Sequence, residues 1–209
     1  LKSILETRYQ NGVIIATNTK QFNYLDSYRF NPTSYVDNGL SYGLVWEGRR
    51  LKQYGLNHYE YNEDGIRISK QTNESNKTTY TLEGTRIIHT KTIEGTSLNL
   101  DTYYHYDEKG LLAGFNLLGE EYFYIRDLTG NINSIVDKYG TIMIKYSYDA
   151  WGDPTSEVGS GLTGTQLDIA NIIIKINPYL YKGYCYDRET ELYYCNSRYY
   201  DPKIGRWLS

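Results

Sequence analysis

The side chains that could do chemistry in this chain are few, and most of them are isolated from one another. The three histidines are His58, His89 and His105. None of them has cysteines or carboxylates around it at the spacing that is typical of a zinc site. Isolated histidines of this kind are most often surface or sheet residues. The sequence therefore predicts no metal site and no cofactor.

A denser group of such side chains lies near the C-terminus. Cys185 and Cys195 fall in the two arms of a predicted hairpin. They could form a disulfide in an oxidising compartment or remain as small buried thiols, and the sequence leaves both alternatives open. Arg198 and Asp201 follow, separated by two tyrosines. From the residues alone, we interpret Arg198 and Asp201 as a structural turn with an ion pair.

Composition excludes several function classes. The formal net charge is −3 and basic residues do not cluster, so we expect no binding of nucleic acid. Apolar runs are far shorter than the roughly 20 residues that a membrane-spanning helix needs. The sequence has no signal peptide and begins at Leu1 rather than Met. We therefore expect a fragment or a processed product of a longer protein.

Tyrosine dominates the aromatic residues, with 25 copies against 4 Phe and 3 Trp. Its apolar ring and polar hydroxyl suit a sheet in which one face packs against the core and the other face is exposed to water. Alanine, the best helix former, is scarce, and the 19 glycines fit many tight turns. The sequence therefore predicts an all-β fold.

A short unit, Tyr-x-Tyr-Asp/Asn-x-x-Gly, recurs along the chain. Its clear copies span residues 59–65, 104–110 and 146–152, and looser copies span 80–84 and 122–130. The two tyrosines point to one face of a strand, because side chains alternate along it. The Asp or Asn starts a turn by accepting bonds from backbone amides, and the Gly adopts the positive φ that ends it. Each unit therefore predicts a strand, a tight turn and a return strand.

A single hairpin is marginal in water, so neighbouring hairpins must pair and share their aromatic faces. We therefore expect residues 1–158 to form a curved, spiralling sheet of hairpins. Residues 159–209 are predicted to be a linker followed by a final hairpin block. Within the linker, Thr165–Ile172 could form one or two helical turns with Thr165 as the N-cap, although its β-branched residues disfavour a helix.

Much of the chain resembles the Rhs/YD-repeat proteins, and its end resembles their Rhs repeat-associated core. The segments that carry the resemblance are, in order, WEGRRL, YEYNEDGIRISK, YHYDEKGLLAGF, YFYIRDLTGNINSIVDKYG, YSYDAWGDP, YKGYCYD and LYYCNSRYYDPKIGRW. The family includes bacterial polymorphic toxins, toxin-complex C subunits and teneurins. The resemblance implies a β-shell that encapsulates and delivers a C-terminal toxin in bacterial competition, with the core block turned inward as a plug. It also implies a secreted or cell-surface bacterial protein.

In many members of this family, the core block cuts the chain just after itself by a mechanism like that of aspartic proteases. By position, Arg198 matches the family's arginine and Asp201 its first aspartate. The second aspartate is expected shortly after Trp207, and the printed sequence stops at Ser209. Because an acid–base pair needs both carboxyl groups, we expect this segment to be non-enzymatic. The resemblance thus makes Arg198 and Asp201 a remnant of an autoproteolysis motif.

Two alternatives to a shell segment remain open. One is a cell-surface adhesion module, whose exposed tyrosines would stack on a glycan or on a protein partner. The other is a truncated self-cleaving core. For the shell, the expected partner is the C-terminal toxin domain of the parent chain. Open sheet edges also predict self-association. Because tyrosine recurs in step with the repeat, we favour packing of the inner wall as its role.

Overall fold

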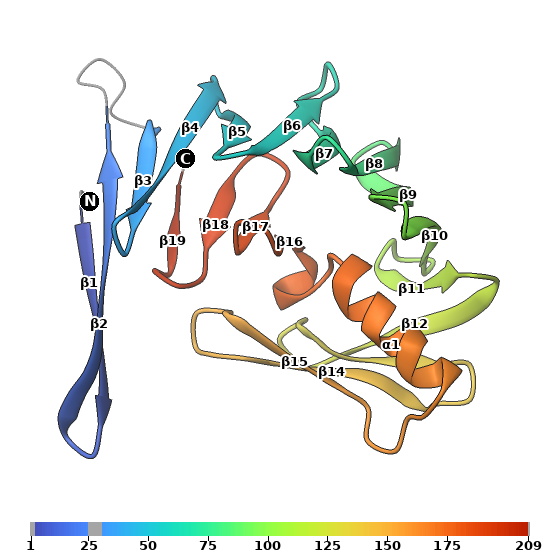
Figure 1. The fold of residues 1–209 in the computed structure, drawn as a ribbon. Helices are drawn as coiled ribbons and strands as arrows, with labels where there is room; N and C mark the ends of the chain where they lie inside the picture. Colours follow the sequence, from blue (N-terminus) through green and yellow to red (C-terminus); the bar gives the residue numbers. More distant parts are fainter. Residues whose placement is uncertain (1–2, 25–30, 209) are drawn as a thin grey trace.

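The computed structural model describes residues 3–24 and 31–208. Fifteen strands pair in chain order, each antiparallel to the next, and form one large sheet that curves into an arch (Figure 1). A second sheet of four short strands follows near the C-terminus, together with one α-helix and a short 3-10 helix. This architecture confirms the predicted curved, mostly β fold.

Short strands joined by tight turns make up both sheets. The large sheet contains β1 (Ser3–Gln10), β2 (Val13–Asn23), β3 (Ser34–Asp37), β4 (Leu40–Glu47), β5 (Arg50–Tyr54), β6 (Asn57–Tyr61), β7 (Arg67–Asn73), β8 (Asn76–Glu83), β9 (Arg86–Glu94), β10 (Leu98–Tyr106), β11 (Leu112–Leu117), β12 (Glu120–Arg126), β13 (Ile132–Asp137), β14 (Ile142–Tyr148) and β15 (Pro154–Val158). The helices are α1 (Thr165–Ile176) and η1 (Tyr181–Gly183), and the small sheet contains β16 (Cys185–Asp187), β17 (Leu192–Tyr194), β18 (Tyr199–Asp201) and β19 (Arg206–Trp207).

The turns of the repeat form by the mechanism that the sequence predicts. Asp107 Oδ1 accepts hydrogen bonds from the backbone N–H groups of Lys109, at 2.9 Å, and of Leu111, at 2.8 Å. The same pair of bonds is repeated at Asp127, Asp137 and Asp149. One aspartate therefore satisfies two backbone N–H groups that, because they lie in the turn, have no partner among the hydrogen bonds between strands.

The second tyrosine of each unit joins two adjacent strands. The hydroxyls of Tyr61, Tyr106 and Tyr148 donate to the carbonyl oxygens of Leu51, Ile87 and Ile132 on the preceding strand, at 2.7, 2.8 and 2.6 Å. In the looser copy at 122–130, Arg126 stands in this position and donates to the carbonyl of Leu112 at 2.9 Å. The hydroxyl therefore finds a partner inside the wall, which phenylalanine could not provide.

The core lies on the concave side of the arch. The first tyrosine of each clear unit is buried there, namely Tyr59, Tyr104 and Tyr146. These rings belong to one apolar cluster with residues of α1 and of the small sheet. The repeat tyrosines thus pack the inner wall, as we expected, and the large exposed aromatics include only two of the described tyrosines, Tyr103 and Tyr139.

The helix differs from the prediction. α1 has 12 residues rather than one or two turns, and its N-cap is Gly164, with no side-chain hydrogen bond at the cap. The predicted length and the predicted Thr165 cap are therefore wrong. Ala170 and Ile173 are fully buried, and the helix packs against β14 and β15. Burial of this face outweighs the low helix propensity of the β-branched residues.

Candidate functional site

The small sheet lies inside the arch of the large sheet (Figure 1). Its strands pair in the order β16-β17-β18-β19, with Cys185 opposite Tyr194 and Asp201 opposite Arg206. Large parts of both sheets share one buried cluster. The predicted division of the chain into units 1–158 and 159–209 stays a prediction.

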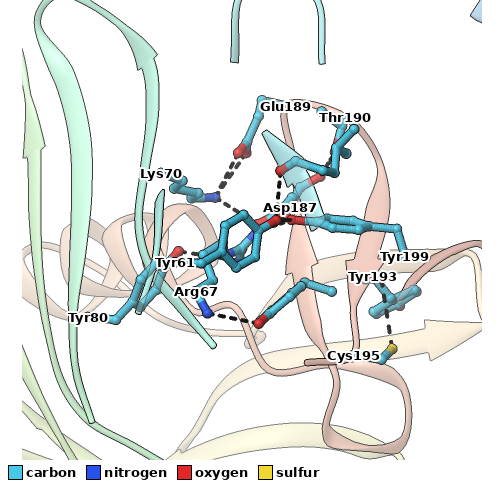
Figure 2. A network of polar contacts seen from close by, with 12 residues as sticks. Tyr61, Arg67, Lys70, Tyr80, Asp187, Glu189, Thr190, Tyr193, Cys195 and Tyr199 are labelled. Atoms are coloured by element: carbon cyan, nitrogen blue, oxygen red, sulfur yellow. Dashed lines mark hydrogen bonds and ion pairs between the residues drawn. The ribbon is translucent and has the colours of Figure 1, made fainter. Parts of the chain in front are cut away.

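A buried ion pair joins the two sheets. Arg67 begins β7 of the arch, and Asp187 ends β16 of the small sheet (Figure 2). Arg67 Nη2 lies 2.9 Å from Asp187 Oδ1, and Arg67 Nη1 contacts the other carboxylate oxygen. Each side chain is only 1% exposed. Lys70 Nζ extends the cluster, at 3.2 Å from Asp187 Oδ1 and 3.0 Å from Glu189.

Aromatic rings enclose the guanidinium of Arg67. Its central carbon lies 5.4, 5.3 and 4.3 Å from the ring centres of Tyr59, Tyr80 and Tyr194. Burial opposes charge on both partners, yet their mutual attraction prevails and leaves the pKa of Arg67 raised and that of Asp187 lowered. Both groups therefore stay charged at neutral pH, and each depends on the other.

Sequence reasoning missed this pair, although the repeat contained a signal for it. Two residues after the turn glycine, other copies place buried apolar residues, Leu112 and Ile132. The copy at 59–65 places Arg67 there instead. The looser copy at 80–84 also has an arginine at this position, Arg86, and that side chain is exposed. A charged residue here is therefore only a weak signal of a buried partner elsewhere in the chain.

The structure does not pair the two residues that the sequence singled out. Arg198 is exposed, and its guanidinium carbon lies 4.0 Å from the centre of a Trp207 ring. Asp201 is 4% exposed and its Oδ1 accepts a hydrogen bond from the N–H of Lys203 at 2.9 Å. The expected turn is present, whereas none of the ion pairs within residues 3–24 and 31–208 joins Arg198 to Asp201. Their role as an autoproteolysis remnant stays a prediction.

Asp201 is buried, and none of the ion pairs among the described residues involves it. Burial raises the pKa of its carboxyl group above the ordinary value, and the neighbouring Lys20 offsets this only in part. A carboxyl whose pKa is raised by folding stabilises the fold below its unfolded pKa, and this contribution is lost as the pH rises through the folded value. The ionised Asp201 therefore lowers stability at neutral pH.

The variant Asp201→Asn is accordingly expected to raise the free energy of unfolding slightly at pH 7. Asparagine keeps an oxygen that accepts the Lys203 N–H bond, but it carries no charge to bury. The gain should shrink at a pH below the raised pKa of Asp201, where the wild-type carboxyl is protonated and carries no charge. Urea unfolding at the two pH values measures both effects, and a variant less stable than the wild type at pH 7 would contradict this account.

The two cysteines are free thiols in the structure. Burial raises the pKa of each, to about 12 for Cys185 and for Cys195. Since the thiolate is the reactive form, both groups are unreactive at neutral pH. The sequence left open a disulfide or free buried thiols. The structure has free thiols, one buried at Cys185 and one partly buried at Cys195.

Two of the three histidines, His89 and His105, lie in cross-strand contacts. His89 Nε2 is 2.8 Å from Asp101 and its Nδ1 is 3.2 Å from the Thr81 hydroxyl, while His105 Nε2 is 2.9 Å from Glu121. Within the described part of the chain, no group of three or more His, Cys, Asp or Glu is placed to hold a metal ion. In the same residues, no helix is long and apolar enough to span a membrane.

One further motif lies between β15 and α1. Residues 159–164 read Gly-Ser-Gly-Leu-Thr-Gly, a spacing that is typical of dinucleotide-binding turns. That fingerprint belongs to parallel βαβ units, whereas β15 is antiparallel to β14. A Cβ on Gly159 would lie only 1.7 Å from the carbonyl oxygen of Ile142. Packing therefore accounts for Gly159, and the motif indicates no nucleotide site.

Sequence comparison identifies relatives among bacterial proteins, although no family model matches the chain. The chain is 36% identical over 151 residues to the "tRNA3(Ser)-specific nuclease WapA" of Bacillus spizizenii and to the "tRNA nuclease WapA" of Bacillus subtilis. Each match covers 72% of this chain and 6% of the relative. The chain thus spans a small fraction of these proteins.

The fold is also similar to those of solved structures. The "Crystal Structure of TcdB2-TccC3" matches 92% of this chain and 12% of that chain, with a TM-score of 0.60 and 18% sequence identity. The structure "TcdB2-TccC3-Cdc42" matches equally far, with a TM-score of 0.58. At this identity the likeness shows a shared fold. Because the WapA match covers 72% of this chain and the chain carries the Tyr-x-Tyr-Asp/Asn-x-x-Gly repeat, it belongs to the Rhs/YD-repeat proteins.

Proposed function

We propose that this chain is a structural, non-enzymatic segment of a toxin-enclosing shell. Residues 1–158 form part of the wall, and residues 159–209 form a plug-like block on its inner side. The observation that carries the proposal is the docking of the small sheet inside the arch, fixed by the buried Arg67–Asp187 pair. A block held there directs the chain that follows it toward the interior.

The relatives support a toxin as the enclosed partner. WapA proteins are named as tRNA nucleases, and this chain matches a stretch that is 6% of their length. By analogy, the parent protein would carry a toxic domain after the present segment and would act outside the producing cell or at its surface. In this proposal Arg198 and Asp201 are the remnant of a self-cleaving motif.

The edges of the large sheet fit a segment of a longer wall. In the strand order of the described residues, β1 and β15 each have one neighbour. Each edge therefore offers unpaired backbone groups to a further strand. Continuation of the wall in the parent protein, or self-association of the isolated segment, would satisfy them.

Proteolysis of the parent protein tests the proposal. With the natural residues after Ser209 retained, we expect a nonspecific protease to digest the following domain at least about tenfold more slowly than the same domain expressed alone. Enclosure would exclude the protease, so protection should persist until the shell unfolds. Equal digestion rates in the two settings would overturn the enclosing function.

Two variants of the parent protein make the test specific to the docked block. Asp187→Asn removes one charge of the buried pair and should accelerate digestion of the following domain. Asp101→Asn is the matched control, because it makes the same chemical change at a carboxylate that is 43% exposed and contacts His89. The control should digest at the wild-type rate.

A further inference from the structure

A cavity of about 320 Å³ lies where the wall meets the inner block. The wall side contributes Thr85, Arg86 and Ile87 at the start of β9, and Tyr106 at the end of β10. The inner block contributes residues 179, 183–185, 194–198 and 207. A ligand in this cavity would therefore touch both sheets at once.

Two uncommitted guanidinium groups line this cavity. Arg86 and Arg198 form no ion pair and no side-chain hydrogen bond with the residues that the structure describes. Each is held against an aromatic ring, with Arg86 5.5 Å from the centre of Tyr106 and Arg198 4.0 Å from that of Trp207. The lining contains no aspartate or glutamate. The cavity thus has positive charge with no internal counterion.

The packing of the two arginine side chains also favours recognition of an anion. The guanidinium of Arg198 lies against the Trp207 ring, which leaves its N–H edge free, and this planar edge matches the two oxygens of a carboxylate or a phosphate. Arg86 Nη2 instead packs against the turn at Gly110, where a Cβ would lie 2.2 Å from it, so Arg86 contributes chiefly its charge. The contacts of Arg198 with Trp207 and of Arg86 with the Gly110 turn limit the rotamers of both side chains, so less entropy is lost when they bind. Asn196 and Ser197 line the same cavity and bring further polar groups.

We propose that this cavity binds a small oxyanion ligand, a phosphate or a carboxylate, with Arg86 and Arg198 as its two anchors. One anchor stands on the wall and the other on the inner block. The bound ligand therefore links the two parts and stabilises the docked arrangement in proportion to its occupancy. This site is separate from the Arg67–Asp187 pair, and anion binding does not depend on the enclosing function, although Arg198 also belongs to the proposed self-cleaving remnant.

A titration of the 209-residue chain with inorganic phosphate at constant ionic strength tests the site. We expect the side-chain N–H resonances of Arg86 and Arg198 to shift saturably, with a dissociation constant of about 1 mM. The melting temperature should rise over the same concentrations. A parallel titration with N-acetylglutamate separates the two ligand chemistries: saturation by one anion alone assigns the site to phosphates or to carboxylates. Failure of both anions to saturate these resonances would overturn the proposal.

Charge-removing variants decide whether the cavity is responsible. Arg86→Gln and Arg198→Gln should each weaken binding at least about tenfold, because each removes a charge-assisted pair. Arg198→Lys keeps the charge without the planar edge and should bind with intermediate affinity. Arg49→Gln is the matched control, since Arg49 is exposed and does not line this cavity. Loss of binding in the control, or unchanged binding in the two cavity variants, would show that the anion binds elsewhere.

Discussion

Replacing Asp187 with asparagine is expected to lower the free energy of unfolding by about 3–5 kcal/mol. The variant leaves the positive charge of Arg67 in a site where the side chain is 1% exposed. An amide oxygen can accept a hydrogen bond from the guanidinium, but it cannot balance its charge. Lys70, 3.2 Å from the same carboxylate, would also lose a partner and would add to the uncompensated positive charge.

Urea unfolding measures this loss, with Asp101→Asn as the matched control. Exposed ion pairs contribute little, so the control should cost less than about 1 kcal/mol. A loss in Asp187→Asn no larger than that of the control would contradict the account. The double variant Arg67→Met with Asp187→Leu should recover much of the stability, because an apolar pair of similar volume leaves no charge unpaired.

Local interactions explain why the large sheet could be predicted from the sequence. The turn at Asp107 is made by bonds to residues two and four positions later, and its glycine follows after three positions. The two tyrosines of a unit lie two positions apart and share a face. Such features recur within a few residues, so the repeat predicts the hairpins, the shared face and the succession of strands.

The docking of the inner block depends on contacts between distant parts of the chain. Arg67 and Asp187 are 120 positions apart. Tyr61 and Tyr199, whose hydroxyls lie 2.9 Å apart, are 138 positions apart. No local pattern specifies which wall strand an inner strand will meet. The inward block could therefore be expected only through the family resemblance, and its contacts with the arch could not be predicted.

Hydroxyl groups explain why the chain uses tyrosine where a simple core would use phenylalanine. Asn177, directly after α1, illustrates this. Its Oδ1 accepts a bond from the Tyr124 hydroxyl at 2.7 Å, and its Nδ2 lies 3.1 Å from the Tyr146 hydroxyl. Two wall strands are thus joined to the inner block by buried, satisfied polar groups. Such bonds fix one arrangement of the two layers, which apolar contact alone leaves less specific.

The close approach of wall and block at Gly152 leads to the second large expected effect. Gly130 and Gly152 end equivalent turns, with φ of 89° and 92° and the same 3.1 Å bond to the aspartate carbonyl three residues earlier. A Cβ on Gly130 would meet nothing within 4 Å, whereas one on Gly152 would lie 2.6 Å from the ring of Tyr181. The carbonyl of Gly152 also accepts a bond from the Tyr193 hydroxyl at 2.8 Å.

Gly130→Ala should therefore cost only the backbone strain of a left-handed residue, about 1–2 kcal/mol. Gly152→Ala should cost the same strain and a further 1–3 kcal/mol or so, because the new methyl group must displace the Tyr181 ring from a packed site. The difference between the two free energies of unfolding, measured in urea, isolates the contact between wall and block from the turn itself. Equal losses in the two variants would mean that the inner block does not rest on this turn in solution, and the docked arrangement would have to be abandoned.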